Sequence, residues 1–261
     1  MTLRLKGESE KVPEELMGAG EISFLVIVVA VVAFLYSSVG HAGASGYIAV
    51  LALWGFTPDT IKPLALFLNI LVASITTWQF YRAGHFSWRL FWPFALLAIP
   101  CAFIGGYLGL PTRYFNLLVG AVLLFSAARF MLRPGPDPEA APPPRVVAVL
   151  TGGALGFLSG LTGTGGGIFL TPLLLFKRWA RVKSAAAVSA LFILANSSAG
   201  LLGNLHRTNQ FPPIAFALAA AVIVGGTLGS YFGSHRFEHG LIKKLLAVVL
   251  LIAGAKLILT A

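Results

Sequence analysis

Seven long stretches of the chain contain no Asp, Glu, Lys or Arg, and this feature limits the possible folds more than any other. They are Ile22–Pro58, Pro63–Tyr81, Leu90–Thr112, Tyr114–Ala128, Val146–Phe176, Ser184–His206 and Thr208–His235. A helix needs roughly 20 apolar residues to cross the hydrocarbon core of a bilayer, and most of the stretches reach that length. Because lipid offers no hydrogen-bond partner to the backbone, such segments must be helical. The sequence therefore predicts an all-α polytopic membrane protein.

Composition and charge placement agree with a multi-pass protein of a cell membrane. Hydrophobic residues make up 57% of the chain and charged residues 11%. The net charge of +10 could suggest nucleic acid, but Lys and Arg lie at the ends of the apolar stretches, where they anchor and orient helices. We expect the lipid bilayer, and no nucleic acid, as a partner. Cys101 is the only cysteine, which excludes a disulfide framework and a thiolate metal cluster. No cofactor or metal is expected.

A proline-rich segment, residues 133–145, divides the chain. It cannot be helical throughout, because proline removes hydrogen-bond donors and clashes with the preceding turn, so it should form an extended linker. Residues 1–21 then form a polar tail, 22–132 a first transmembrane repeat and 146–261 a second. The tail carries mixed charges ahead of the apolar stretch, unlike a cleavable signal sequence.

The two repeats follow the same order. Each has an apolar segment, a glycine-rich stretch, a short apolar piece, a polar turn and three long segments. The glycine-rich stretches are Ser38–Gly46 and Ser159–Gly167. Later landmarks also match, since Gly105-Gly106 corresponds to Gly225-Gly226. We interpret these later glycines as helix-packing surfaces.

The relative direction of the halves depends on how the chain passes each glycine-rich stretch. If it turns back there, the second half is inverted; if it crosses once as a broken helix, the halves are parallel. The hairpin interpretation puts 12 of the 19 Lys and Arg residues on one side, whereas the broken crossing divides them 10 to 9. Positive residues favour the cytoplasmic side. The sequence thus favours an inverted repeat, each half a Gly-interrupted helix hairpin plus three transmembrane helices, with the 133–145 linker and Lys177–Lys183 cytoplasmic.

Interrupted helices at matching positions in a repeat indicate a transporter's binding site. A helix that begins inside the membrane presents unpaired N–H groups and a positive dipole end, which suit an anion. We expect such helices to begin at Gly46 and Gly167. The candidate substrate-binding residues are Gly40, His41, Gly43, Ser45, Gly46, Asn69, Ser74, Thr162, Gly163, Thr164, Gly165, Gly166, Gly167, Asn196 and Ser197.

Plainer roles for these residues stay open. The glycines can serve only to let helices pack closely, and the hydroxyls and amides can bond to nearby carbonyls. His41, the only histidine near the middle of an apolar run, can bind an anion, carry a coupling proton or be structural.

The positions of the acidic residues narrow the function. All nine lie in tails, loops or segment ends, whereas carriers of cations or protons usually bury carboxylates in their path. The prediction is a secondary transporter of a small anion, working by alternating access around a central site between the two broken helices. An anion channel, a membrane-embedded enzyme and an assembly subunit are the alternatives. An enzyme is not expected, because no buried carboxylate pair or histidine cluster is present. The oligomeric state is left open, a homodimer included.

With these residues identified, the chain resembles the sulfite exporter TauE/SafE family of membrane permeases. The resemblance extends from about Ile22 to Leu259 and is most specific at Gly160–Pro172, where a glycine-rich stretch precedes a proline. It implies roles for Gly163, Gly165, Gly166, Gly167 and Pro172. The first half departs from the pattern, with Leu51 where a partner of Pro172 would stand. The resemblance implies transport of sulfite, a sulfonate or another small organic anion.

Overall fold

The computed structural model describes residues 17–108, 120, 124, 127–128, 140–204 and 212–259. Most of the predicted polar tail, most of the closing segment of the first half and linker residues 133–139 lie outside this part of the chain. Within it every regular element is helical, which confirms the all-α prediction. Six helices are long and apolar enough to cross a membrane.

The helices of the two halves follow one another in the predicted order. The first half has α2 (Ala19–Ser38), α3 (Ala44–Leu53), α4 (Pro58–Arg82) and α5 (Trp88–Leu108). The second has α7 (Arg145–Thr162), α8 (Gly167–Phe176), α9 (Val182–Asn204), α10 (Ile214–Tyr231), the π-helical turn η2 (Phe232–Arg236) and α11 (His239–Leu259). Helix α2 begins inside the predicted tail, because the Glu21 carboxylate accepts a hydrogen bond from the N–H of Gly18, at 3.2 Å, and stabilises the first turn.

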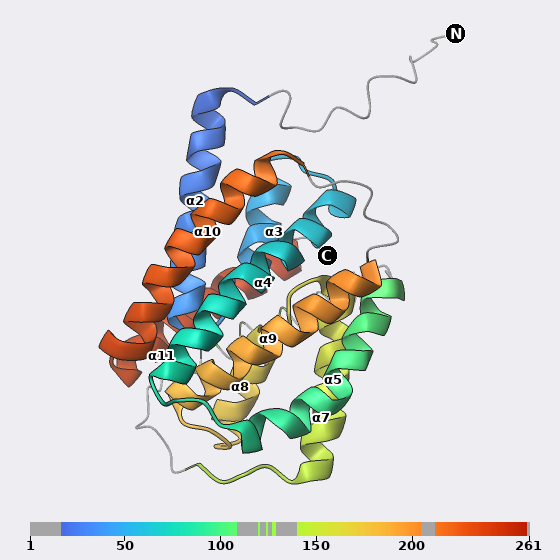
Figure 1. Ribbon diagram of the computed structural model, residues 1–261, viewed down its shortest axis with the longest axis vertical. Helices are drawn as coiled ribbons and strands as arrows, with labels where there is room; N and C mark the ends of the chain where they lie inside the picture. Colours follow the sequence, from blue (N-terminus) through green and yellow to red (C-terminus); the bar gives the residue numbers. More distant parts are fainter. Residues whose placement is uncertain are drawn as a thin grey trace.

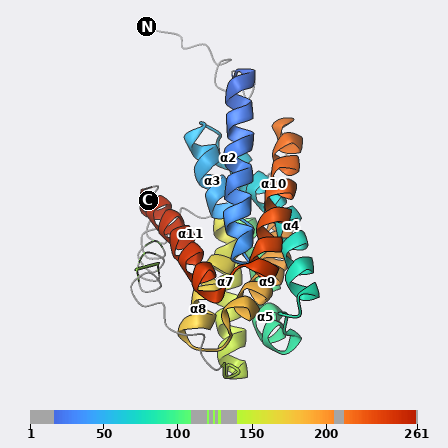
Figure 2. The ribbon, with the colours of Figure 1, turned by 90° about the vertical axis from the view of Figure 1, so that its left-hand side faces the viewer.

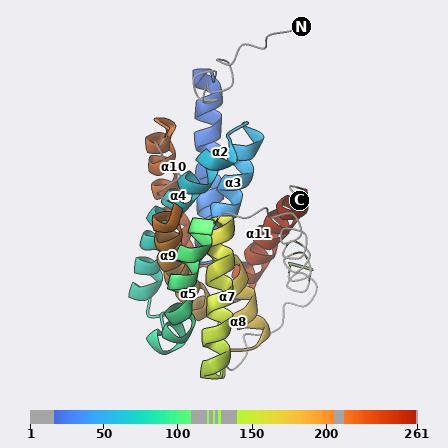
Figure 3. The same cartoon turned by 90° about the vertical axis from the view of Figure 1, so that its right-hand side faces the viewer.

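Each short helix folds back beside the long helix that precedes it. Helix α3 runs beside the middle of α2, with Gly46 near Val32 and Trp54 near Phe24, and points towards the top of Figure 1, here the upper end; Figure 2 shows the same pairing. Helix α8 lies next to the lower half of α7, as Figure 3 shows. Helices α3 and α8 have 10 residues each, and a helix rises about 1.5 Å per residue, so each covers about half of the hydrocarbon core. Both breaks are buried within the helix bundle, since Gly43 and Gly166 are buried.

Glycines in the left-handed region shape both breaks. Gly43 and Gly166 precede α3 and α8 with φ of +100° and +79°, values that favour glycine. The first short helix therefore begins at Ala44, whereas the sequence prediction placed its start at Gly46. Gly46 lies inside α3, where a Cβ atom would come within 2.5 Å of Val32, so it is a packing glycine. With Gly43 matched to Gly166, the position corresponding to Pro172 is Ala49 and not Leu51.

Glycine-to-carbonyl contacts join each half to the other. At three glycines of α7, an added Cβ atom would collide with a backbone carbonyl of α5. At three glycines of α10 and η2, it would collide with a backbone carbonyl of α2. The pairs are Gly152 with Phe94, Gly156 with Ala98, Gly160 with Ala102, Gly225 with Ala30, Gly229 with Phe34, and Gly233 with Ser38. Residue numbers rise together in both series, so the paired helices run parallel. The predicted packing role thus holds for Gly225, and also for Gly226, where a Cβ would come within 3.1 Å of the Val72 side chain.

Helices α4 and α9 cross the centre in opposite directions. Helix α4 descends from the upper end and α9 rises from the lower end (Figure 1). Two broken crossings would make these helices run the same way, so their directions favour the hairpin interpretation. The inversion of the halves across a membrane stays a prediction.

We predict that the lower end faces the cytoplasm. In a Cys101→Ala background, cysteines introduced singly at Ala140 and Lys177, both exposed, should resist an impermeant thiol reagent in intact cells, because Lys and Arg concentrate on the cytoplasmic side. A cysteine at Thr57, exposed at the upper end, should react and serves as the control. Labelling of Ala140→Cys or Lys177→Cys from outside would contradict the predicted orientation.

Candidate functional site

Buried polar side chains gather around the two breaks and form what we call the central polar cluster. Its members share near-complete burial and come from α2, the first break, α3, α4, α7, the second break, α8 and α9. They are Tyr36, His41, Ser45, Asn69, Ser159, Thr164, Thr171, Ser189, Asn196 and Ser197. None of the buried side chains in the described part of the chain is Asp, Glu, Lys or Arg. The cluster therefore acts through hydrogen bonds and dipoles and carries no fixed charge.

Asn69, on α4, connects both breaks. Its Oδ1 accepts a hydrogen bond from the N–H of Ala44, the first residue of α3, at 2.9 Å. Its Nδ2 donates to Ser197 Oγ at 3.2 Å and, more weakly, to the Thr164 carbonyl at 3.5 Å. One carboxamide thus satisfies backbone groups that lipid would leave unpaired at both chain breaks.

His41 connects the first break to the second half. Its Nε2 lies 2.9 Å from Thr171 Oγ1, which donates to Ser189 Oγ at 2.7 Å. Because the Thr171 hydrogen is engaged with Ser189, Thr171 Oγ1 accepts from His41, so we assign the proton of the neutral ring to Nε2. The main chain of Gly167 lies near the ring, but no polar atom forms a hydrogen bond with Nδ1. Nδ1 can therefore accept a hydrogen bond, or donate one after protonation.

Two tyrosines complete the first break. Ser45 Oγ donates to the Tyr36 hydroxyl at 3.0 Å, and the Tyr47 hydroxyl donates to the Ala42 carbonyl at 2.6 Å. The Tyr36 and His41 rings have centroids 6.5 Å apart. These contacts hold α2, the first break and the start of α3 together.

Asn196 and Ser159 are buried and lack hydrogen-bond partners. Both polar atoms of the Asn196 side chain and the Ser159 hydroxyl are unpaired, and both residues are 0% exposed. One turn after Asn196, a Cβ on Gly200 would lie 3.5 Å from Gly160, the residue after Ser159, so the helices carrying both side chains pack together at this level. A buried unpaired carboxamide costs roughly 1–3 kcal/mol. Such groups call for an explanation, and a ligand would supply the missing bonds.

The second break lies directly against these groups. A Cβ on Gly165 would approach Asn69 Nδ2 to 2.6 Å and Ser197 Oγ to 2.9 Å. A Cβ on Gly166 would meet the Phe192 ring at 2.9 Å and Ser159 Cβ at 3.2 Å, and one on Gly163 would meet the Lys62 side chain at 3.0 Å. Of these three glycines, Gly165 and Gly166 therefore lie against members of the cluster.

The structure brings most predicted site residues to the breaks, but not all of them. Gly40 lies in the first break, where a Cβ would meet Ala186 at 2.5 Å. Thr162 is half-buried and bonds to the Leu158 carbonyl and to Thr164 Oγ1, both at 2.8 Å. Ser74 is exposed and donates to the Ile70 carbonyl of its own helix at 2.7 Å, so it lies outside the cluster.

Sequence reasoning missed several members of the cluster. Tyr36, Thr171 and Ser189 lie within stretches that the sequence analysis assessed only by their lack of charge. A usable signal was present, because a tyrosine in the interior of a membrane helix needs a partner for its hydroxyl. Thr171 also directly precedes Pro172 in the glycine-rich motif. Among the described residues, no three His, Cys, Asp or Glu side chains come together as a metal site.

These features define the class of protein. Six apolar helices of spanning length, exposed large side chains such as Phe24, Leu96 and Phe216, and an uncharged polar centre together describe a multi-pass membrane protein. Its outer surface faces lipid, and its interior holds the polar residues.

The chain belongs to the sulfite exporter TauE/SafE family, whose family model matches residues 25–257. It is 42% identical over 239 residues to a probable membrane transporter protein of Sinorhizobium fredii, covering 90% of this chain and 97% of the relative. A probable membrane transporter protein of Methanocaldococcus jannaschii is 24% identical over 228 residues, covering 78% and 84%. One of Xylella fastidiosa is 27% identical over 213 residues, covering 76% and 78%. No solved structure matches the chain. The match to this family confirms the resemblance predicted from the sequence. The family is one of membrane transporters.

We predict that Asn69→Leu destabilises the fold. The variant leaves the Ala44 N–H without its acceptor and removes the donor to Ser197, and a buried unpaired group costs about 1–3 kcal/mol. Thermal unfolding in detergent should therefore shift to lower temperature. Ser74→Ala on the same helix is the matched control and should change stability by less than about 0.5 kcal/mol. Equal midpoints for Asn69→Leu and the wild type would show that Asn69 does not hold the breaks together.

Proposed function

We propose that the protein is a secondary transporter of a small oxyanion that binds in the central polar cluster. The observation that carries the proposal is the group of unpaired polar atoms on Asn196, Ser159 and His41 beside two broken helices. Ser159 and His41 lie next to the start of α8, and Asn196 lies on α9 at the level where α9 packs against α7; these atoms are buried without a hydrogen-bond partner. A bound ligand would satisfy them.

The charge of the ligand follows from the lining. The described part of the chain buries no carboxylate, so the cluster offers a cation no counter-ion. Carboxamide N–H groups, hydroxyls and the positive ends of α3 and α8 can instead stabilise negative oxygens. A small oxyanion suits this lining. The family's description as sulfite exporters supports sulfite or a related sulfonate as the substrate.

Burial of the cluster favours alternating access. Asn196 and Ser197 are 0% exposed, so a ligand can reach them only if the helices move. We propose that the halves form an inverted repeat whose hairpins enter from opposite ends, and that their relative movement opens the cluster to each side in turn. The chain contains no nucleotide-binding loop of the Walker type. An ion gradient is the proposed driving force.

An anion channel is the alternative within transport. It would need a continuous open path, whereas a carrier exchanges substrate across a closed barrier. Saturable counterflow of labelled sulfite in proteoliposomes would identify a carrier, and conductance without counterflow would identify a channel.

We predict that Asn196→Leu removes ligand binding but leaves the fold intact. The substitution keeps the side-chain shape and deletes two unpaired polar atoms, so stability should stay within about 1 kcal/mol or rise. The increase in thermal midpoint on adding sulfite, which reports binding to the folded state, should disappear, together with sulfite counterflow. Dimethyl sulfone, a neutral sulfur–oxygen compound of similar size, should produce no shift in the wild type.

The matched control is Thr76→Val. Thr76 is also buried with an unpaired hydroxyl, but it lies two helical turns beyond Asn69, about 10 Å along the helix. It should keep both the sulfite response and counterflow. If Asn196→Leu still responds to sulfite, the ligand binds elsewhere. A sulfone response equal to that of sulfite would remove the electrostatic argument.

We further propose that His41 carries a coupling proton. Its Nδ1 is buried without a hydrogen-bond partner, while its Nε2 is bonded to Thr171 within the cluster. His41→Gln should retain sulfite counterflow but lose the sulfite accumulation that a pH gradient drives in proteoliposomes. Accumulation that persists in the variant, or that is absent from the wild type, would contradict this role.

A further inference from the structure

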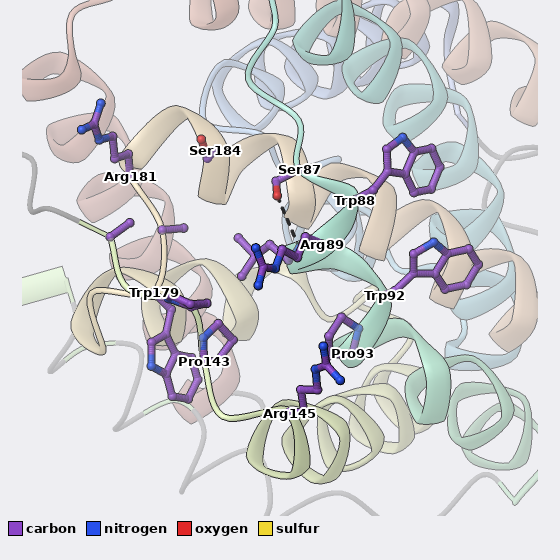
Figure 4. Close-up of a pocket in the computed structure, with 14 residues that line it drawn as sticks. Ser87, Trp88, Arg89, Trp92, Pro93, Pro143, Arg145, Trp179, Arg181 and Ser184 are labelled. Carbon is purple, nitrogen blue, oxygen red and sulfur yellow. Dashed lines mark hydrogen bonds between the residues drawn. The ribbon is translucent and has the colours of Figure 1, made fainter.

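A pocket of about 910 Å³ opens at the lower end of the molecule. It shares no lining residue with the central polar cluster, and the proposed function assigns it no role. Three segments form its wall: the start of α5, the residues before α7 and the loop before α9 (Figure 4). The N–H of Ala141 donates to the Arg178 carbonyl at 3.0 Å, which ties the second segment to the third.

Positive charge concentrates around this pocket. Arg89, Arg145 and Arg181 line it, and none of the lining residues is Asp or Glu. Figure 4 shows Arg89 and Arg145 extending into the space between the start of α5 and the start of α7, whereas Arg181 points away. Two guanidinium groups that face one space repel each other. An anion between them would attract both, so that the sum of the interactions becomes favourable.

Helix ends add to the positive potential. Helices α5, α7 and α9 begin at Trp88, Arg145 and Val182, all at or next to the pocket wall. The positive ends of three dipoles therefore point towards it, and a cationic side chain at such an end is unfavourable, whereas an anion is favoured. Arginines at these helix starts lower the stability of the helices, and residues that lower stability in this way are typical of functional sites.

Tryptophans place the mouth of the pocket at the membrane interface. Trp88 and Trp92 are 50% and 55% exposed and stack with ring centroids 6.1 Å apart. Tryptophan rings concentrate at the depth of lipid headgroups. Trp179 lies on the opposite side beside Pro143, as Figure 4 shows, and its ring packs against Phe94 at 6.2 Å. The pocket thus opens where phosphate groups of lipids are present.

We propose that this pocket binds a tetrahedral oxyanion, a phosphate or sulfonate group, between Arg89 and Arg145. Guanidinium groups match the oxygens of such a group with paired hydrogen bonds. The oxyanion is supplied by an anionic phospholipid headgroup or by a soluble anion at the membrane surface, since both present the same chemistry. The site is separate from the central polar cluster and does not depend on the proposed transport function.

The test measures thermal stabilisation of the full chain by two probes. Inorganic phosphate is titrated against protein in nanodiscs of phosphatidylcholine, and nanodiscs that also contain phosphatidylglycerol are compared with these. The wild type should be stabilised by at least one probe. The double variant Arg89→Gln/Arg145→Gln should need at least about tenfold more phosphate for the same shift, or lose the phosphatidylglycerol shift. Arg89→Lys/Arg145→Lys, which keeps the charge, should respond between the two and shows that loss of the response is not misfolding.

The matched control is Arg82→Gln/Arg236→Gln. Both arginines are exposed at the same end of the molecule but lie outside the pocket. The control should respond as the wild type does. Stabilisation by phosphatidylglycerol alone identifies a lipid headgroup as the source, and stabilisation by phosphate alone or by both identifies the oxyanion itself. An unresponsive wild type, an unaffected Arg89→Gln/Arg145→Gln variant or an equal loss in the control would overturn the proposal.

Discussion

Backbone groups at a helix end inside lipid must find a partner within the protein, and the centre of this molecule is organised around that constraint. Two helices end and two begin inside the helix bundle, where the residues of both breaks are largely buried. The Asn69 carboxamide binds the first N–H of α3, a carbonyl of the second break and a hydroxyl of α9. Since one side chain serves both breaks, these must lie at the same depth and in contact with the same central helices.

Glycine packing makes that meeting possible. Carbonyls of α5 and α2 lie where Cβ atoms of other residues would stand on α7 and α10, so each half holds the other at close range. In a membrane, where burial of apolar surface gives no drive to associate, such close contact is a main source of helix–helix stability. The positions of the breaks therefore depend on glycines well outside them.

The molecule separates its charged groups from its uncharged polar groups. The central polar cluster has hydroxyls, carboxamides and one imidazole, whereas arginines gather at the lower end around an open pocket. Desolvation explains the division, because a charge in the hydrocarbon region is costly without a partner, and the same charge near headgroups remains solvated. An anion would meet fixed positive charge at the surface and only hydrogen-bond donors and dipoles in the interior.

Residue order alone determined the class of protein, its helical content, the breaks at both glycine-rich stretches and the family. These follow from hydrophobicity, charge position and the backbone freedom of glycine, which are properties of each residue or its near neighbours. The tertiary structure decided which polar side chains meet. It starts α3 at Ala44, turns Ser74 away from the cluster, and brings Tyr36, Thr171 and Ser189 into it. The rotation of each helix about its axis is set by contacts with helices distant in the chain, so local sequence patterns do not predict it.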